Sequence, residues 1–183
     1  MIRSQETIKS SFGNDGSSPG GFPWIESQGI RGMTKKNKVK LEGEKIYDNE
    51  GYWLRAACVC VKALDEKEGE VLLVSGSGRP ESWIIPGGKM KALEEPEASA
   101  VREAKEEAGV VGILGRCLGS FDNPERKHRT KVFVLRVTHL LEDFEDKDSR
   151  KRSWFPIDDA VRLLHPYKPN HCKYLNALKQ TRP

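Results

Sequence analysis

Residues 88–110 read GKMKALEEPEASAVREAKEEAGV, and this stretch decides both the fold and the chemistry that we expect. Residues 94–108 are rich in strong helix formers, which predicts a helix over this range. Pro96 stands where a first helical turn tolerates proline, and Gly109 stands where helices commonly end. One side of this helix is apolar and small enough to pack closely on a sheet, through Val101, Ala104 and Ala108.

The opposite side of the predicted helix gathers acidic side chains. Glu103, Glu106 and Glu107 stand at positions i, i+3 and i+4, so their carboxylates lie side by side on one ridge. Like charges at this spacing repel one another unless a cation lies among them, and a hard divalent ion such as Mg²⁺ suits carboxylate oxygens. Arg102 lies beside the ridge, where it can pair with Glu94 or Glu106 and hold these carboxylates in position. The alternative is a solvated acidic face with no ligand.

Short apolar runs separated by polar turns predict strands around this helix. RAACVCV (55–61) and EVLLVS (70–75) predict a hairpin. WIIPGG (83–88) predicts a third short strand that is ended by Pro86 and the two glycines. Two longer strands, separated by a polar loop, are expected over residues 113–121 and 129–140.

Helices are expected to follow these strands. Asp158 or Asp159 can cap a helix that runs to Leu164, and a last helix is expected over residues 170–180. Strands mixed with helices in this order predict a layered domain of the α/β or α+β type. The spacing of the cysteines matches no zinc site, so we expect reduced thiols: Cys58, Cys60, Cys117 and Cys172.

The length of 183 residues suits one domain, and the composition indicates which part of the chain forms it. Residues 1–44 are largely rich in glycine, serine and proline, which predicts a disordered tail, and we expect the catalytic domain over residues 45–183. The formal net charge of +4 suits an anionic partner. Without an apolar span or a secretory signal, we expect a cytoplasmic protein, with the nucleus as an alternative, that does not bind membranes.

The spacing Gly88-x5-Glu94-x7-Arg102-Glu103-x-x-Glu106-Glu107 resembles the box that defines the Nudix hydrolases. The resemblance implies an α/β/α sandwich with a mixed β-sheet. Further segments narrow the resemblance to one branch of this family, the diphosphoinositol polyphosphate phosphohydrolases. These segments are residues 55–58, 70–75, 83–88, 125–130, 141–143 and 150–155. This branch implies hydrolysis of phosphoanhydrides in inositol pyrophosphates, with diadenosine polyphosphates as additional substrates.

The resemblance also implies a role for each residue of the box. Glu103, Glu106 and Glu107 would hold Mg²⁺, or Mn²⁺ as the alternative, together with a carbonyl of Gly87 or Gly88. One glutamate would accept the proton of the attacking water, and we favour Glu107 for this role. Together with Arg102 and Glu94, these glutamates make up the expected catalytic set.

A small polyanionic substrate requires a site crowded with cations, and the chain offers several basic clusters. We expect substrate contacts from Arg55, Ser75, Ser77, Arg79, Lys89, Arg126, Lys127, His128, Arg129, Arg150, Lys151 and Arg152. The alternative for the clusters at 126–129 and 150–152 is solvated surface charge. Structural roles are expected for His139, His165 and His171.

Other functions stay open at this point. Trp53 and Leu54 stand where the family usually carries basic residues, and Trp53 could stack on adenine, which would favour dinucleoside polyphosphates as the main substrates. A non-catalytic module that binds RNA or inositol phosphate is an alternative of another class. Nucleic acid is not an expected partner, because the basic loops lack interleaved aromatic residues. We expect a monomer.

Overall fold

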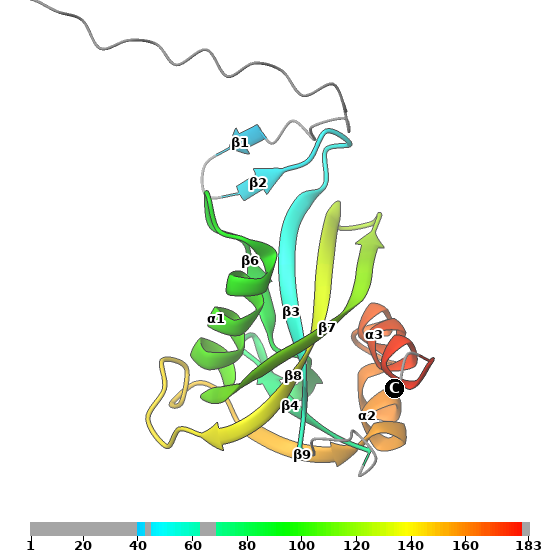
Figure 1. The fold of residues 1–183 in the computed structure, drawn as a ribbon. Helices are drawn as coiled ribbons and strands as arrows, with labels where there is room; N and C mark the ends of the chain where they lie inside the picture. Colours follow the sequence, from blue (N-terminus) through cyan, green and yellow to red (C-terminus); the bar gives the residue numbers. More distant parts are fainter. Residues whose placement is uncertain (1–39, 43–44, 63–68, 181–183) are drawn as a thin grey trace, which may run out of the picture. The chain divides into compact units, whose positions relative to one another are not determined.

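A computed structural model of the chain describes residues 40–42, 45–62 and 69–180, within which nine strands and three helices form (Figure 1). The strands are β1 (Lys40–Glu42), β2 (Lys45–Tyr47), β3 (Trp53–Val61), β4 (Glu70–Gly76), β5 (Arg79–Ile84), β6 (Gly87–Lys89), β7 (Val110–Asn123), β8 (His128–Leu140) and β9 (Arg152–Pro156). The helices are α1 (Pro96–Ala108), α2 (Ile157–Leu164) and α3 (Pro169–Gln180). Residues 1–39 of the expected tail lie outside the described residues, and β1 precedes the domain boundary expected at residue 45.

The strands form one mixed sheet, which confirms the expected fold class. Strands β3 and β8 run parallel at its centre, with Trp53 opposite His128 and Val61 opposite Arg136. The other pairs are antiparallel: β7 pairs with β8, β6 with β3, β4 with β3, β5 and β9, and β2 with β1 and β3. Helix α1 covers one face of the sheet, and α2 and α3 cover the other, which makes the α/β/α sandwich (Figure 1).

Each central strand carries an apolar run, residues 56–61 of β3 and 132–135 of β8, because both faces of these runs are buried. On β3, Ala57, Val59 and Val61 pack with residues of α2 and α3. The alternate residues of the same strand, which include Cys58 and Cys60, pack with α1. Strand β8 alternates in the same way, as its sequence predicted, and all four cysteines are free thiols.

Helix α1 forms where the sequence predicted it, with its start at Pro96 rather than at residue 94. It ends because Gly109 takes up the left-handed conformation (φ 61°), from which its N–H bonds back to the carbonyls of the last turn. Ala100, Ala104 and Ala108 are fully buried against the sheet, so small side chains bring the helix close to β3. The acidic ridge lies beside these alanines and not on the opposite side of the helix as expected, because Glu103 and Glu107 are buried as well.

Two strand predictions need correction. The expected hairpin pairs at two positions, Cys60 opposite Leu72 and Val61 opposite Val71, whereas from Val74 onward β4 pairs with β5; β9 pairs along the other edge of β4. The run at residues 83–88 is not a single strand. Strand β5 ends at Ile84, and the glycines belong to β6, which lies so close to β3 that a methyl group at Gly87 would come within 2.5 Å of the Ala57 Cβ.

The capping prediction for α2 is wrong. The residue that precedes the helix is Pro156, and no side chain caps the first turn. Asp158 and Asp159 lie inside that turn, where they face the positive end of the helix dipole. The last helix, α3, confirms the prediction for residues 170–180. In the part of the chain that the structure describes, no helix is long and apolar enough to cross a membrane.

Candidate active site

The acidic ridge of α1 faces strand β6, and the two elements enclose its carboxylates. Glu103 and Glu107 are each only 8% exposed, whereas Glu106 is more accessible. The Glu103 carboxylate lies against Gly88, where an added Cβ would come within 2.1 Å of Oε2. The glycine of the box therefore leaves the space that this carboxylate occupies.

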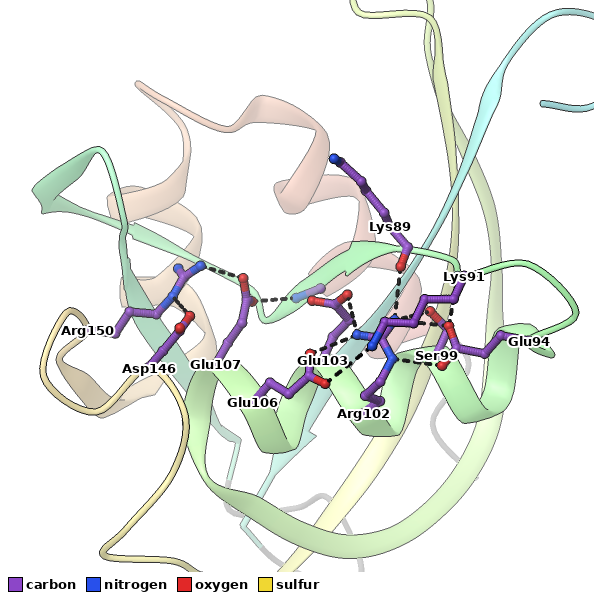
Figure 2. A network of polar contacts seen from close by, with 11 residues as sticks. Lys89, Lys91, Glu94, Ser99, Arg102, Glu103, Glu106, Glu107, Asp146 and Arg150 are labelled. Atoms are coloured by element: carbon purple, nitrogen blue, oxygen red, sulfur yellow. Dashed lines mark hydrogen bonds and ion pairs between the residues drawn. The ribbon is translucent and has the colours of Figure 1, made fainter. Parts of the chain in front are cut away.

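Arg102 is the centre of the network on the first half of the ridge (Figure 2). Its Nε and Nη2 donate to the two carboxylate oxygens of Glu94, at 2.7 and 3.0 Å. Its Nη1 donates to both Glu103 and Glu106, each at 2.8 Å. The predicted pairing of Arg102 is thus present, and these hydrogen bonds lower the pKa of Glu94 to about 2.

Glu107 is held separately, at the other end of the ridge (Figure 2). The backbone N–H of Gly87 donates to its Oε2 at 2.9 Å, and Arg150 donates to its Oε1 at 2.5 Å. Burial raises the pKa of Glu107 to about 7, although Arg150 and the Gly87 hydrogen bond oppose the shift. Burial also raises the pKa of Glu103. Burial therefore disfavours the charged forms of Glu103 and Glu107.

Arg150 reaches Glu107 from a segment that is distant in the sequence. Its Nε donates to Asp146 at 2.7 Å and its Nη1 donates to the Ser75 carbonyl at 2.9 Å, and its side chain is only 8% exposed. Arg150 was expected among the substrate contacts. In the structure its guanidinium holds Glu107 instead, and it lines the cavity beside the box.

The ridge has the donor chemistry of a divalent-metal site. Within the described ranges, no three acidic, histidine or cysteine side chains converge on one point, because Arg102 lies between Glu103 and Glu106 and Arg150 holds Glu107. The donors nevertheless fit, since carboxylate oxygens are the ligands that Mg²⁺ prefers. Because Gly88 has no side chain, the Glu103 carboxylate can lie against the backbone of β6.

Two adjoining cavities lie beside the ridge. One, of about 730 Å³, is lined by the box residues Gly88, Glu103 and Glu107. The second, of about 550 Å³, extends between β3, the β7–β8 turn and the start of α3. Arg55 and Gly87 line both cavities, and the Arg55 Nη2 donates to the Gly87 carbonyl at 2.7 Å. We call the second space the cationic cavity, after the side chains that surround it: Arg55, Arg126, His128, Lys168 and Lys173.

The structure gathers some of the expected substrate contacts around these cavities. Arg55, Arg126 and His128 line the cationic cavity, and Ser77 and Lys89 line the cavity beside the box. Arg79 lines a smaller adjoining cavity of about 320 Å³, together with Arg126 and Lys168.

Other expected contacts serve the fold. Arg129 forms ion pairs with three carboxylates, those of Asp48, Glu50 and Asp122. The ammonium of Lys127 lies over the Tyr52 ring, 5.2 Å from its centre. The 126–129 cluster was expected as a loop, but His128 and Arg129 belong to β8, so their side chains point to opposite faces of the sheet.

In the second basic cluster, residues 150–152, two residues also serve the fold. Arg152 donates to the Ala108 carbonyl at 2.7 Å and so binds the C-terminal end of α1. Ser75 is buried, and its hydroxyl accepts the N–H of Lys151 at 2.9 Å. Neither Ser75, Lys151 nor Arg152 lines the three cavities described above.

Sequence reasoning missed the contribution of the C-terminal helix. Residues just before α3 and in its first two turns line the cationic cavity, among them Lys168, Asn170, His171, Lys173 and Tyr174. Their spacing carries no motif, and they lie more than 60 positions beyond the box in the printed sequence. His171 was expected to have a structural role, and the cavity shows that it also lines the site.

The family description "NUDIX domain" matches residues 53–178. The chain is 56% identical over 145 residues to diphosphoinositol polyphosphate phosphohydrolase 3-alpha of Mus musculus, covering 78% of this chain and 87% of that protein. It is 54% identical over 144 residues to diphosphoinositol polyphosphate phosphohydrolase 2 of Homo sapiens, covering 78% of this chain and 79% of that protein.

Among solved structures, a C. elegans Ap4A hydrolase in a binary complex matches with a TM-score of 0.56, covering 69% of this chain and 96% of that one. At 20% sequence identity this likeness shows the fold alone. The family match, the close relatives and the complete acidic box agree, and the chain belongs to the Nudix hydrolases, a family of enzymes that generally use divalent metal ions.

Proposed function

We propose that the protein hydrolyses phosphoanhydride bonds of diphosphoinositol polyphosphates in a Mg²⁺-dependent reaction, with diadenosine polyphosphates as additional substrates. The names of the close relatives support the inositol pyrophosphates, since those proteins are diphosphoinositol polyphosphate phosphohydrolases. The chain covers most of their length, and the match to the family over residues 53–178 includes the box and the residues around both cavities.

The cationic cavity is the observation that carries this proposal. Arg55, Arg126 and Lys168 surround a space that opens to the acidic ridge through Arg55 and Gly87. Burial and the neighbouring Arg126 and Arg55 lower the pKa of Lys168, which means that these cations repel one another in the free protein. A ligand with several phosphate groups relieves this repulsion, and its anhydride can then reach the ridge.

The residues of the ridge supply the remaining chemistry. Mg²⁺ would be held by Glu103, Glu106 and Glu107, and it would supply positive charge that neutralises phosphate oxygens and lowers the pKa of water. The oxygen of a water attacks phosphorus, and the bond from phosphorus to the bridging oxygen breaks with its electron pair leaving on the departing phosphate. Glu107, which Gly87 and Arg150 hold at the end of the ridge, accepts the proton of the water. Arg102 keeps Glu103, Glu106 and Glu94 in place.

Dinucleoside polyphosphates as the main substrates are the second candidate, and Trp53 is the observation that favours them. The indole lines the cationic cavity, where an aromatic surface could contact adenine. Its Nε1 also donates to the Arg126 carbonyl at 3.1 Å, and its ring contacts Arg55 and the edge of His128. Because the indole contacts three polar residues of the cavity, we favour a role in which Trp53 holds the residues of the phosphate site in place.

The test is Mg²⁺-dependent turnover of an inositol pyrophosphate beside diadenosine hexaphosphate under identical conditions. The variant Glu107→Gln should lower kcat by about 100- to 10,000-fold, because it removes the proposed base and a metal ligand. Glu97→Gln is the matched control, because Glu97 is exposed on the same helix and lines none of the described cavities.

Each outcome of this test has a defined meaning. Preferred turnover of the inositol compound supports the proposal, and preferred turnover of the nucleotide supports the second candidate. If neither substrate turns over, or if Glu107→Gln matches the wild type, the assignment is wrong.

The monomeric state, the cytoplasmic or nuclear location and the disordered tail are further proposals that rest on the sequence. Size-exclusion chromatography with light scattering tests the first of them. Removal of residues 1–32 tests the third, and we expect it to leave turnover intact.

A further inference from the structure

His171 joins the cationic cavity to the strand segment that carries the catalytic backbone. It lies in the first turn of α3, and its ring lines the cavity. The backbone N–H of Ile85 donates to its Nδ1 at 3.1 Å, and the ring stacks on Tyr174 with centres 5.1 Å apart. Two residues after Ile85, Gly87 holds Glu107 through its N–H and Arg55 through its carbonyl.

The hydrogen bond from Ile85 decides which ring nitrogen carries the proton. A backbone N–H can only donate, so Nδ1 must accept and therefore keeps its lone pair. In a neutral ring the proton then belongs to Nε2, which becomes a donor only. The neutral form is favoured, because burial and the neighbouring Lys168, Arg55 and His128 lower the pKa of His171 to about 3.

The Nε2–H is available to a ligand. Among the described residues, the hydrogen bond found for the His171 ring engages Nδ1, and the one buried side-chain nitrogen or oxygen that lacks a partner is the Nε of Arg136, so Nε2 is neither bonded nor fully buried. Because His171 lines the cavity and its Nδ1 is taken up by Ile85, Nε2 is the ring nitrogen that remains for a ligand there. The ring is a rigid donor among flexible lysine and arginine side chains.

We propose that His171 is a specificity-determining residue, which donates a hydrogen bond from Nε2–H to a phosphate oxygen of the polyanionic substrate in the cationic cavity. This inference rests on the proposed function, because it takes the ligand of the cavity to be the substrate. The same ring anchors Ile85, and so it couples the binding of phosphate to the position of the Gly87 segment.

Two substitutions separate the two roles of the ring. In His171→Asn, the side-chain oxygen can replace Nδ1 as the acceptor for Ile85, but no donor reaches the position of Nε2. In His171→Gln, the longer amide can restore a donor near Nε2, but the acceptor for Ile85 is lost. We expect His171→Asn to raise KM for the inositol pyrophosphate by roughly 10- to 100-fold, with kcat and Tm near wild type.

For His171→Gln we expect the opposite pattern, which is a lower Tm with a smaller change in KM. His139→Asn is the matched control, since His139 is exposed on β8 and lines none of the described cavities. A wild-type KM for a folded His171→Asn protein would overturn the inference.

Nitrogen NMR of the wild-type protein tests the inference without any variant and without turnover. We expect an unprotonated Nδ1 and a protonated Nε2 at neutral pH, and we expect the Nε2–H signal to shift when inositol hexakisphosphate is added without metal. The inference is overturned if Nδ1 is protonated, or if the Nε2–H signal does not shift at saturating inositol hexakisphosphate. Either result overturns it even where wild-type turnover supports the proposed function. A responding signal in a protein that does not hydrolyse the inositol pyrophosphate supports the binding role and contradicts only the proposed function.

Discussion

The fit between Gly88 and Glu103 makes Gly88→Ala a sensitive test of the site. A methyl group at Gly88 would lie 2.1 Å from Glu103 Oε2, 2.3 Å from its Cδ and 2.4 Å from its Oε1. Relaxed contacts between heavy atoms are about 3.5 Å, so the carboxylate would have to move by roughly 1 Å or more. That movement would disturb its hydrogen bond from Arg102 and its place in the proposed metal site.

A displacement of about 1 Å at a reacting centre can lower the rate by about 100-fold, or about 2.7 kcal/mol in activation free energy. We therefore expect Gly88→Ala to lower kcat by about 100-fold at saturating Mg²⁺, measured as phosphate release from an inositol pyrophosphate. Gly115→Ala on β7 is the matched control, because its added methyl group would meet neighbours only at 3.4 Å or beyond. If Gly88→Ala turns over at the wild-type rate, the Glu103 carboxylate does not need its observed position, and our reasoning fails.

Two further predictions concern arginines and pH. Arg126→Ala should raise KM for the inositol pyrophosphate by about tenfold or more, because Arg126 lines the cationic cavity. Arg129→Ala should instead lower the free energy of unfolding by roughly 1–3 kcal/mol with little change in KM, because Arg129 pairs with three carboxylates. Steady-state kinetics measures the first effect and urea denaturation the second. A larger effect of Arg129→Ala on KM would contradict its assignment to the fold. The pKa of Glu94 is lowered from 4.5 to about 2 by Arg102, so its ionised form stabilises the folded state above pH 4.5, and this stabilisation is lost as the pH falls toward 2. The difference in unfolding free energy between wild type and Glu94→Gln should therefore shrink over this range, and a constant difference would refute it.

Helix α1 was predictable because its determinants are local. Its limits follow from Pro96 and Gly109, and the pairing of Arg102 with Glu106 follows from their spacing of one helical turn. Glu94 lies just before the helix, eight positions from Arg102, and was within reach as the expected partner across the first turn. The fold class followed from the order of the elements and from the resemblance to the Nudix box.

Two of the predictions that failed depended on contacts between distant segments. The glycines at the end of the 83–88 run suggest that a strand ends there. In the structure Gly87 belongs to β6, and because it has no side chain this strand can lie close to β3. Similarly, Arg126 and Arg129 look equivalent in a basic cluster. The structure separates them, because Arg126 lines the cationic cavity whereas Arg129, at the start of β8, pairs with nearby carboxylates.

The sequence by itself determined the acidic ridge, its arginine and the family, because these depend on spacing along a single helix. Tertiary structure alone decided what surrounds the ridge. Arg150 reaches Glu107 across 43 positions, and His171 reaches Ile85 across 86. The first contact forms when the segment before β9 packs beside α1, and the second forms when α3 packs on the sheet. The geometry of this packing is not encoded in the local spacing of any one segment.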